Sequence, residues 1–240
     1  MTQKERMLKE MLYYPADTVL AGERAKAKEL CFDFNQCRPS HGETRVAILK
    51  ELLGKTGENV WMEQPIYFDY GCNTEVGENF FANANCVILD VAKVTIGKNV
   101  MFAPNVSIYT AGHPLHPETR NSGWEYGIGI SIGDNVWVGG NVVINPGVHI
   151  GNNVVIGSGS VVTKDIPDNC VAVETRPESS KRSRMRIKNI ILKTASLRPA
   201  ERSQMDLKHR DLRDYTKRAE IWVVPSPVFT YSFCVPFSPT

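Results

Sequence analysis

Hydrophobic residues recur at every sixth position through the middle of the chain, and this period is its most specific pattern. Starting at residue 132, each step of six reaches an aliphatic β-branched residue: Ile132, Val138, Ile144, Ile150, Ile156 and Val162. An earlier block at residues 96–108 repeats the register, and a weaker one runs through residues 76–89. A period of six fits neither the turn of an α-helix nor the simple alternation of a strand.

The six-residue period predicts a solenoid with three faces, in which about 18 residues complete one coil. Each hexad supplies one short strand and one tight corner, and its aliphatic anchor points inward onto the equivalent anchor of the next coil. Neighbouring coils then pair as parallel strands about 4.8 Å apart. A small or polar residue follows each anchor, as at Gly133, Gly139 and Gly151. We expect this residue to take the left-handed or tightly turned backbone of the corner.

Two segments lie outside the period. Residues 1–58 lack hexads and predict amphipathic helices over 1–12, 19–34 and 44–53, which together would form a small helical cap. The solenoid itself is expected over 59–173, interrupted by a loop at 109–131. A long loop that projects from a rigid solenoid is a natural place for chemistry.

Composition agrees with a soluble globular protein. Of the 240 residues, 42% are hydrophobic and 22% are charged. No apolar run approaches the roughly 18 residues of a membrane span, and the N-terminal ten residues are too polar for a secretory signal. The six scattered cysteines lack a Cys-x-x-Cys pair, which predicts reduced thiols and a cytoplasmic location.

Five motifs, the hexads and the helical cap carry a family resemblance. The motifs are Tyr67–Gly71 (YFDYG), Asn79–Asn83 (NFFAN), Ala111–Pro114 (AGHP), Asn135–Gly139 (NVWVG) and Val161–Pro167 (VVTKDIP). Together they resemble the maltose and galactoside O-acetyltransferases among the hexapeptide-repeat acetyltransferases. The resemblance runs from about residue 3 to residue 173, and Asp69 with the loop sequence at 123–126 brings it nearer to the maltose enzymes.

This resemblance implies a left-handed parallel β-helix that assembles as a homotrimer, with each active site between subunits. It implies acetyl-CoA as co-substrate, a sugar as acceptor, no tightly bound cofactor and no metal. Neither nucleic acid nor a membrane is expected as a partner. In this family the acceptor hydroxyl attacks the thioester directly, and His113 would be the general base. Histidine suits that task because its ordinary pKa lies near 6.5. His116 is expected to be structural or a surface residue.

The resemblance also assigns substrate-binding residues. Asp69, Asn83 and Glu125 would contact the sugar, and Glu125 could instead orient His113. The alternatives are that Asp69 is a surface turn acid and that Asn83 is a corner residue that satisfies the backbone. Galactoside enzymes are expected to carry an acid where this chain has Val91, and the neighbouring Asp90 is a candidate to replace it.

Five further positions resemble those that bind the coenzyme. Trp137 would lie beside the pantetheine path, although a core or trimer contact explains it equally well. Gly140 and Ser158 would let the pantetheine approach the backbone closely. Thr163 and Lys164 would meet the nucleotide end, where lysine serves as a charged phosphate partner.

The sequence changes character after residue 173. Residues 1–173 carry a net charge of −5 and every glycine, whereas residues 174–240 carry +7. Glu174-Thr175-Arg176 can be written GAA ACC CGN, and one restored G turns it into Gly-Asn-Pro, which the family has there. The same shift turns residues 186–193 into the family's Lys-Lys-Tyr-Tyr signature. We therefore expect residues 174–240 to be a poorly ordered, out-of-frame tail.

Other functions are open at this stage. The altered tail could leave a folded but inactive β-helical remnant. A metal-dependent protein of the γ-carbonic anhydrase type would use the same β-helix, with three histidines around a metal, and His113, His116 and His149 are the candidates. An acetyltransferase for another acceptor, such as a xenobiotic, is the third alternative.

Overall fold

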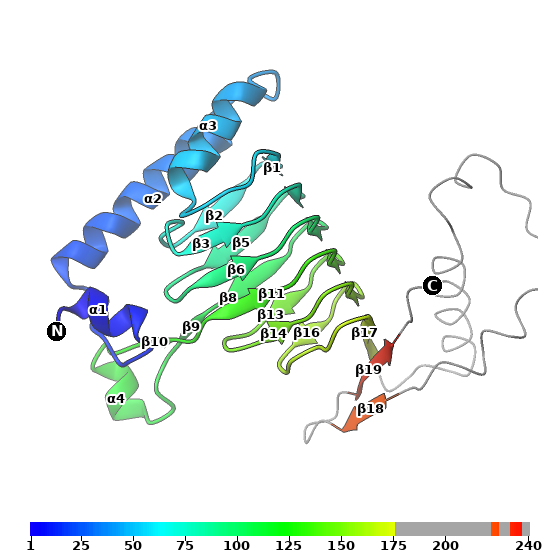
Figure 1. Ribbon diagram of the computed structural model, residues 1–240. Coiled ribbons are helices and arrows are strands. Elements are labelled where there is room, and N and C mark those ends of the chain that lie inside the picture. The colour runs from blue at the N-terminus through cyan, green and yellow to red at the C-terminus, as the bar shows by residue number, and fades with distance from the viewer. Residues whose placement is uncertain (176–221, 226–230, 237–240) are drawn as a thin grey trace, which may run out of the picture. The chain divides into compact units, whose positions relative to one another are not determined.

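The computed structural model describes residues 1–175, 222–225 and 231–236. The chain divides into two compact units, residues 1–168 and residues 169–240. The first unit contains three N-terminal helices, a solenoid of short strands and a projecting loop with a fourth, short helix (Figure 1). In the second unit, strands β17 (Cys170–Thr175) and β18 (Trp222–Pro225) both pair antiparallel with β19 (Tyr231–Pro236). The proposed frameshift falls mainly on residues outside these described ranges.

Three helices form the N-terminal cap: α1 (Gln3–Leu8), α2 (Thr18–Gln36) and α3 (Gly42–Leu52). The Asp17 carboxylate caps α2 by accepting hydrogen bonds from the first-turn backbone. The last two helices match the sequence prediction to within two residues. The first prediction, a helix over 1–12, was too long. The helix ends at Leu8 because Glu10 takes a left-handed backbone with φ of 57° and turns the chain away.

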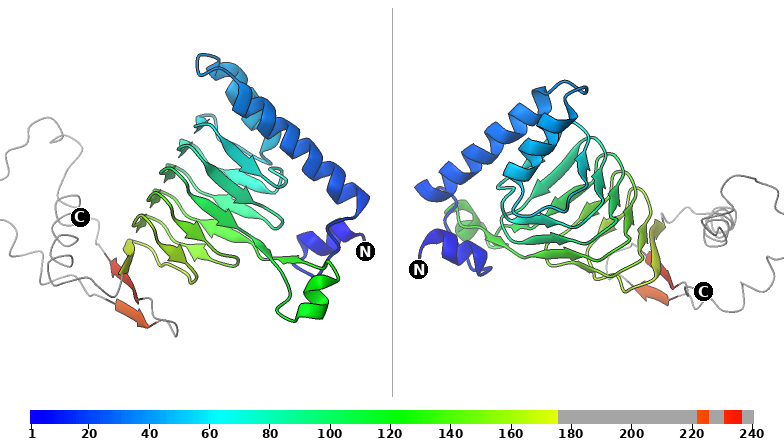
Figure 2. Two further views of the ribbon diagram at one scale, coloured as in Figure 1. Left: turned by 180° about the vertical axis from the view of Figure 1, so that it is seen from behind. Right: turned by 45° about the horizontal axis from the view of Figure 1, so that its top comes forward.

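Three parallel sheets form the sides of the solenoid. Sheet I contains β1 (Val60–Met62), β4 (Phe80–Ala82), β7 (Met101–Phe102), β12 (Trp137–Val138) and β15 (Val155–Ile156). Sheet II contains β2 (Ile66–Phe68), β5 (Cys86–Leu89), β8 (Ser107–Tyr109), β13 (Val143–Ile144) and β16 (Val161–Val162). Sheet III contains β3 (Thr74–Val76), β6 (Val94–Ile96), β11 (Ile130–Ile132) and β14 (His149–Ile150). The chain visits the sheets in this order, once per coil, and the coils stack as Figure 2 shows.

The stacked anchors confirm the sequence prediction. Ile132 pairs with Ile150, Val138 with Ile156 and Ile144 with Val162, so the coil closes after 18 residues as the hexads indicated. All six anchors are buried, and so are the apolar residues four positions after them. The chain therefore forms the predicted left-handed parallel β-helix, whose core is a set of stacked aliphatic side chains.

The predicted role of the glycines after the anchors was wrong. Gly133, Gly139 and Gly151 are not among the left-handed residues. They are needed for space, because a Cβ atom at Gly133 would lie 2.8 Å from the backbone of Gly151 in the next coil. The left-handed corner lies three positions after the anchor, at asparagines such as Asn135 and Asn153, since asparagine tolerates positive φ better than most residues.

Asparagines form a side-chain ladder along the corner after sheet III, and all of them except Asn59 have a left-handed backbone. Each amide nitrogen donates to the amide oxygen one coil further on, at 2.9–3.1 Å. The ladder runs through Asn59, Asn79, Asn99, Asn135 and Asn153. It satisfies polar groups at the turns and adds to the strand pairing and the stacked core that join neighbouring coils.

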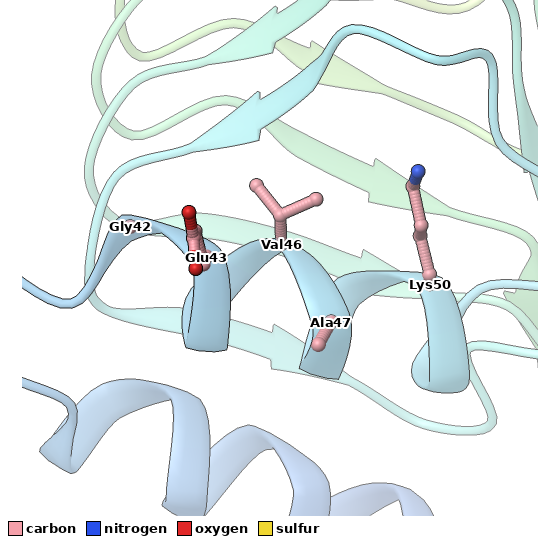
Figure 3. Close-up of a pocket in the computed structure, with 5 residues that line it drawn as sticks. All are labelled: Gly42, Glu43, Val46, Ala47 and Lys50. Atoms are coloured by element: carbon pink, nitrogen blue, oxygen red, sulfur yellow. The ribbon is translucent and has the colours of Figure 1, made fainter.

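The cap attaches to the first coil through a buried arginine on α3. Arg45 is 2% exposed and lies over the rings of Phe34 and Trp61. Its guanidinium donates to the Met62 carbonyl at 2.6 Å and forms an ion pair with Glu63 at 3.2 Å. The α3 helix also lines a shallow pocket of about 470 Å³ (Figure 3). Its lining residues are Gly42, Glu43, Val46, Ala47 and Lys50, so the pocket contains none of the predicted site residues.

Within the part of the chain that the structure describes, four cysteines are free thiols, namely Cys31, Cys37, Cys72 and Cys86. Cys170 is disulfide-bonded, which contradicts the expectation that every thiol is reduced. Among the residues that the structure describes, no helix combines the length and the apolar character needed to cross a membrane.

Candidate active site

The projecting loop leaves the solenoid between sheets II and III, after β8, and returns at β11. It contains β9 (Ala111–Gly112), α4 (Pro117–Asn121) and β10 (Tyr126–Gly127). Strands β9 and β10 pair antiparallel and close the base of the loop. Gly112 is required there, because a Cβ atom at this position would lie 2.7 Å from the ring of Tyr126.

Buried polar contacts fix the base of this loop to the coil. The Thr110 hydroxyl donates to the Leu89 carbonyl at 2.8 Å and accepts from the Ala92 backbone at 2.9 Å. Thr110 is fully buried, and its carbonyl accepts the backbone N–H of Ile128 at 2.9 Å. The loop therefore starts from a rigid position, although its tip extends away from the solenoid.

His113 is exposed and directly follows the β9–β10 ribbon. Further along the loop, the Arg120 guanidinium donates to the carbonyls of Pro114 and Leu115 at 3.3 and 2.9 Å. These bonds hold the chain on the C-terminal side of the histidine. His116 is also exposed and begins α4 as its N-cap residue, without a side-chain capping bond. His113 thus lies between the paired strand β9 and the segment bound by Arg120, and its residue is exposed.

The two acids among the predicted sugar-binding residues, Asp69 and Glu125, lie close together at the same corner. Burial raises the pKa of Asp69, and the Glu125 carboxylate raises it further, whereas Lys28 and Arg24 act in the opposite direction. Glu125 accepts a hydrogen bond from the Tyr13 hydroxyl. The arrangement brings hydrogen-bond acceptors and cations together at the corner from which the loop emerges.

Arg24 and Tyr70 belong to this cluster and were missed by the sequence analysis. The Arg24 guanidinium donates to the Tyr70 hydroxyl at 2.6 Å and to the Pro15 carbonyl at 2.6 Å. Burial raises the pKa of Tyr70 to about 12. Tyr70 lies inside the YFDYG motif that carried the resemblance, but nothing in a single sequence distinguishes Arg24 from the other charges of its helix.

Asp90 does not replace the acid that galactoside enzymes are expected to carry. It is fully buried, accepts the Tyr70 backbone N–H at 2.8 Å and accepts the Thr74 hydroxyl at 3.0 Å. Burial raises its pKa to about 6. Asp90 therefore holds the turn at residues 70–74, and its neighbour Val91 packs in an apolar cluster with Tyr13 and Tyr70.

Asn83 lies at a different corner of the β-helix. It follows β4, between sheets I and II, whereas the loop with His113 leaves between sheets II and III. Its side-chain oxygen accepts the backbone N–H of Ala84 at 2.8 Å. Within one chain, the structure therefore does not bring Asn83 together with His113.

Three of the predicted coenzyme residues are on the same side as Asn83. Trp137 lies on β12 of sheet I and is 48% exposed. Gly140 and Ser158 lie at the following corner in neighbouring coils, where the Gly140 backbone donates to the Ser158 hydroxyl at 3.1 Å. Thr163 and Lys164 are exposed after β16, at the corner between sheets II and III. The structure thus divides these predicted positions between two corners.

The described residues contain no cluster of side chains suited to binding a metal ion. No group of three or more histidine, cysteine, aspartate or glutamate side chains is placed to hold an ion there. His149 lies on β14, where its ring nitrogen shares a hydrogen bond with the Ser131 hydroxyl at 2.8 Å.

Solenoid, helical cap and projecting loop define a class of protein, the hexapeptide-repeat transferases. Residues 6–57 match the family model for the maltose acetyltransferase hexapeptide capping motif. Residues 129–164 match the model for the bacterial transferase hexapeptide, in six repeats.

Individual relatives narrow the assignment. The galactoside O-acetyltransferase of Escherichia coli (strain K12) is 49% identical over 172 residues, which cover 72% of this chain and 85% of the relative. A crystal structure of a maltose O-acetyltransferase from Clostridium difficile 630 is 55% identical with a TM-score of 0.72, covering 74% and 94% of the two chains. A galactoside acetyltransferase in complex with coenzyme A is 48% identical with a TM-score of 0.70, covering 72% and 86%. This chain belongs to the maltose and galactoside O-acetyltransferase family and is an acetyltransferase.

Proposed function

We propose that this protein transfers the acetyl group of acetyl-CoA to a hydroxyl of a sugar such as maltose or glucose. The observation that carries the proposal is the exposed His113 on a rigidly rooted loop, next to the corner that holds the Asp69 and Glu125 carboxylates. Acetyl-CoA is the proposed donor because relatives of this identity bind coenzyme A.

His113 is the proposed general base. Its neutral imidazole takes the proton of the acceptor hydroxyl as the hydroxyl oxygen attacks the thioester carbonyl. The tetrahedral intermediate collapses by breaking the carbon–sulfur bond. The imidazolium then returns the proton to the departing coenzyme thiolate, so the histidine ends neutral and no acyl-enzyme forms.

The acceptor is proposed to be held by hydroxyl donation to carboxylates. Asp69 and Glu125 offer acceptor oxygens in a partly buried setting, where hydrogen bonds to a charged group are strong. Asn83 is proposed to contact the sugar from another subunit. A neutral polyol fits this corner better than an anion, because the two carboxylates would repel a negative charge.

The coenzyme is proposed to follow the outside of the coils. Trp137 would pack beside the pantetheine, and Gly140 and Ser158 would admit it close to the backbone. Thr163 and Lys164 would meet the nucleotide end, with Lys164 as a charged partner for phosphate. No resident metal takes part in the proposed reaction.

A homotrimer is proposed because one chain keeps Asn83 and His113 at different corners. A three-fold arrangement would place the first corner of one copy against the second corner of the next. The outward faces of sheets I and II support such packing, since sheet I carries an outward apolar column in which Met101 and Trp137 are exposed, and sheet II carries exposed Tyr67 and Val161. That column runs through Trp61, Phe81, Met101, Trp137 and Val155. Sheet III instead presents Glu75, Thr95, Ser131 and His149.

The proposed location is the cytoplasm, which the four free thiols support. The disulfide-bonded Cys170 does not fit a reducing compartment, but it belongs to the second unit. Residues 174–240 of this unit are proposed to be an out-of-frame translation. A folded but inactive protein is accordingly the alternative outcome for this chain.

Free-thiol release from acetyl-CoA, measured over a panel of sugars, tests the function. We expect turnover with maltose or glucose that disappears in His113→Ala and persists in His116→Ala, whose imidazole lies outside the proposed site. Loss of activity in both variants, or in neither, would contradict the role of His113. If the wild-type chain is inactive, the assay is repeated with the restored reading frame, and continued inactivity there refutes the proposed function.

A further inference from the structure

An N-terminal segment, residues 6–14, crosses the projecting loop and contacts it at three successive points. The Arg6 guanidinium lies 5.8 Å from the ring centroid of Trp124, and Tyr14 packs edge-on against the same ring at 6.1 Å. The Glu10 carboxylate accepts the backbone N–H of Gly129 at 2.8 Å. We call this set of contacts between residues 6–14 and the loop the clasp.

Tyr13 is the centre of the clasp. Its backbone N–H donates to the Glu125 carbonyl at 3.0 Å, and the Glu125 N–H donates back to the Tyr13 carbonyl at 3.2 Å. Its hydroxyl donates to the Glu125 carboxylate, and its side chain is fully buried. Burial and the adjacent carboxylate raise the pKa of Tyr13 well above its ordinary value, so the phenol keeps its proton for this bond.

We propose that Tyr13 is a positioning residue that fixes the Glu125 carboxylate and, through it, the acceptor side of the loop. Tyr13 is enclosed by the protein and reaches the acceptor only through Glu125. The carboxylate has a limited number of orientations when one oxygen accepts a buried phenol. The cap thereby becomes part of the acetyl-transfer site, a role that the sequence analysis did not predict for residues 6–14. The kinetic consequence rests on the proposed sugar acetylation.

The Tyr13→Phe variant isolates this hydroxyl, because it keeps the ring in the core and both backbone bonds. Loss of a hydrogen bond to a charged group changes the equilibrium constant of the process that depends on it by about 10- to 100-fold. We expect the acceptor KM to rise about tenfold, while the KM for acetyl-CoA stays within about twofold. The matched control is Tyr14→Phe, which removes a hydroxyl from an exposed side chain and keeps the ring that faces Trp124. Equal effects on both substrates, or from both variants, would overturn the proposal.

A double-mutant cycle separates positioning from general stability. If Tyr13 acts through the carboxylate, Tyr13→Phe has no further effect on the acceptor KM in a Glu125→Ala background. Additive effects of the two substitutions would mean that the hydroxyl acts elsewhere, and the proposal would fail.

Amide hydrogen exchange tests the clasp without any activity. In Tyr13→Phe we expect the loop amides at residues 125–129 to exchange about tenfold faster, while the amides of the stacked coils keep their protection. Unchanged exchange in the loop, or a uniform increase throughout the chain, would overturn the proposal. This measurement decides the role of Tyr13 even if the wild-type protein acetylates no sugar.

Discussion

Glycine-to-alanine substitutions at three positions test how the corners of the β-helix are built. At Gly133 the backbone has no positive φ, but an added Cβ atom would lie 2.8 Å from the Gly151 backbone and 2.7 Å from the Asn152 side chain. At Gly159, φ is 79° and the space is open. At Gly22, inside helix α2, the space is open and φ is not left-handed. An added methyl group therefore meets steric crowding at Gly133, backbone strain at Gly159 and neither effect at Gly22.

The expected free energies of unfolding follow from these environments. Gly133→Ala forces two coils apart against backbone atoms, and we expect a loss of about 3 kcal/mol, at the upper end of overpacking effects. Gly159→Ala should lose about 1 kcal/mol, which is the left-handed strain of an L-residue reduced by the lower entropy of its unfolded chain. Gly22→Ala should gain about 1 kcal/mol, because alanine is the better helix former and nothing obstructs its methyl group.

Urea denaturation followed by circular dichroism measures all three variants under one condition. Because each substitution adds the same methyl group, the order of stability is the decisive result. A Gly159→Ala variant less stable than Gly133→Ala would refute the assignment of close packing to the residue after the anchor.

Two further predictions concern buried charges. Burial raises the pKa of Asp90 to about 6. The contribution of its protonated side chain to the free energy of unfolding is therefore greatest below pH 4 and is lost as the pH rises through 6. Between pH 4 and 8, the wild type should lose about 3 kcal/mol of unfolding free energy relative to Asp90→Asn, and parallel pH profiles would contradict this. Arg45→Ala should destabilise the protein by about 3 kcal/mol, because it removes two ring contacts and leaves the Met62 carbonyl without its donor. Lys26→Ala, which removes an exposed ion pair, should lower the free energy of unfolding by less than about 0.5 kcal/mol. Thermal unfolding of both variants measures the difference, and equal losses of stability would refute the role of Arg45.

The sequence predicted those parts of the fold that repeat. Each hexad has the same pattern of apolar and small residues and three hexads complete a coil, so the stacking of Ile132 on Ile150 follows from their separation of 18 positions. The exit of the loop after Ile108 followed because the hexads stop there. Asp69 and Glu125 were placed near each other only through the family resemblance, since 56 positions separate them in the sequence.

The remaining features depend on packing that a single sequence does not record. Glycine after an anchor looks like a turn signal, and only the distance to the next coil shows that Gly133 is needed for space. From the sequence, Asp90 is a candidate sugar-binding acid. Its burial and its two hydrogen-bond donors show instead that it holds a turn. The end of α1 was predicted too late because Glu10 and Tyr13 are committed to contacts with the distant loop.

The clasp also has a consequence for the order in which the molecule folds. Successive bonds of the asparagine ladder join residues 18, 20 or 36 positions apart. Each coil can therefore assemble on the preceding one while the chain leaves the ribosome. The bonds from Tyr13 to Glu125 and from Gly129 to Glu10 span 112 and 119 positions. Residues 6–14 must wait until about half of the chain has been synthesised, so the clasp closes after the cap and the first coils have formed.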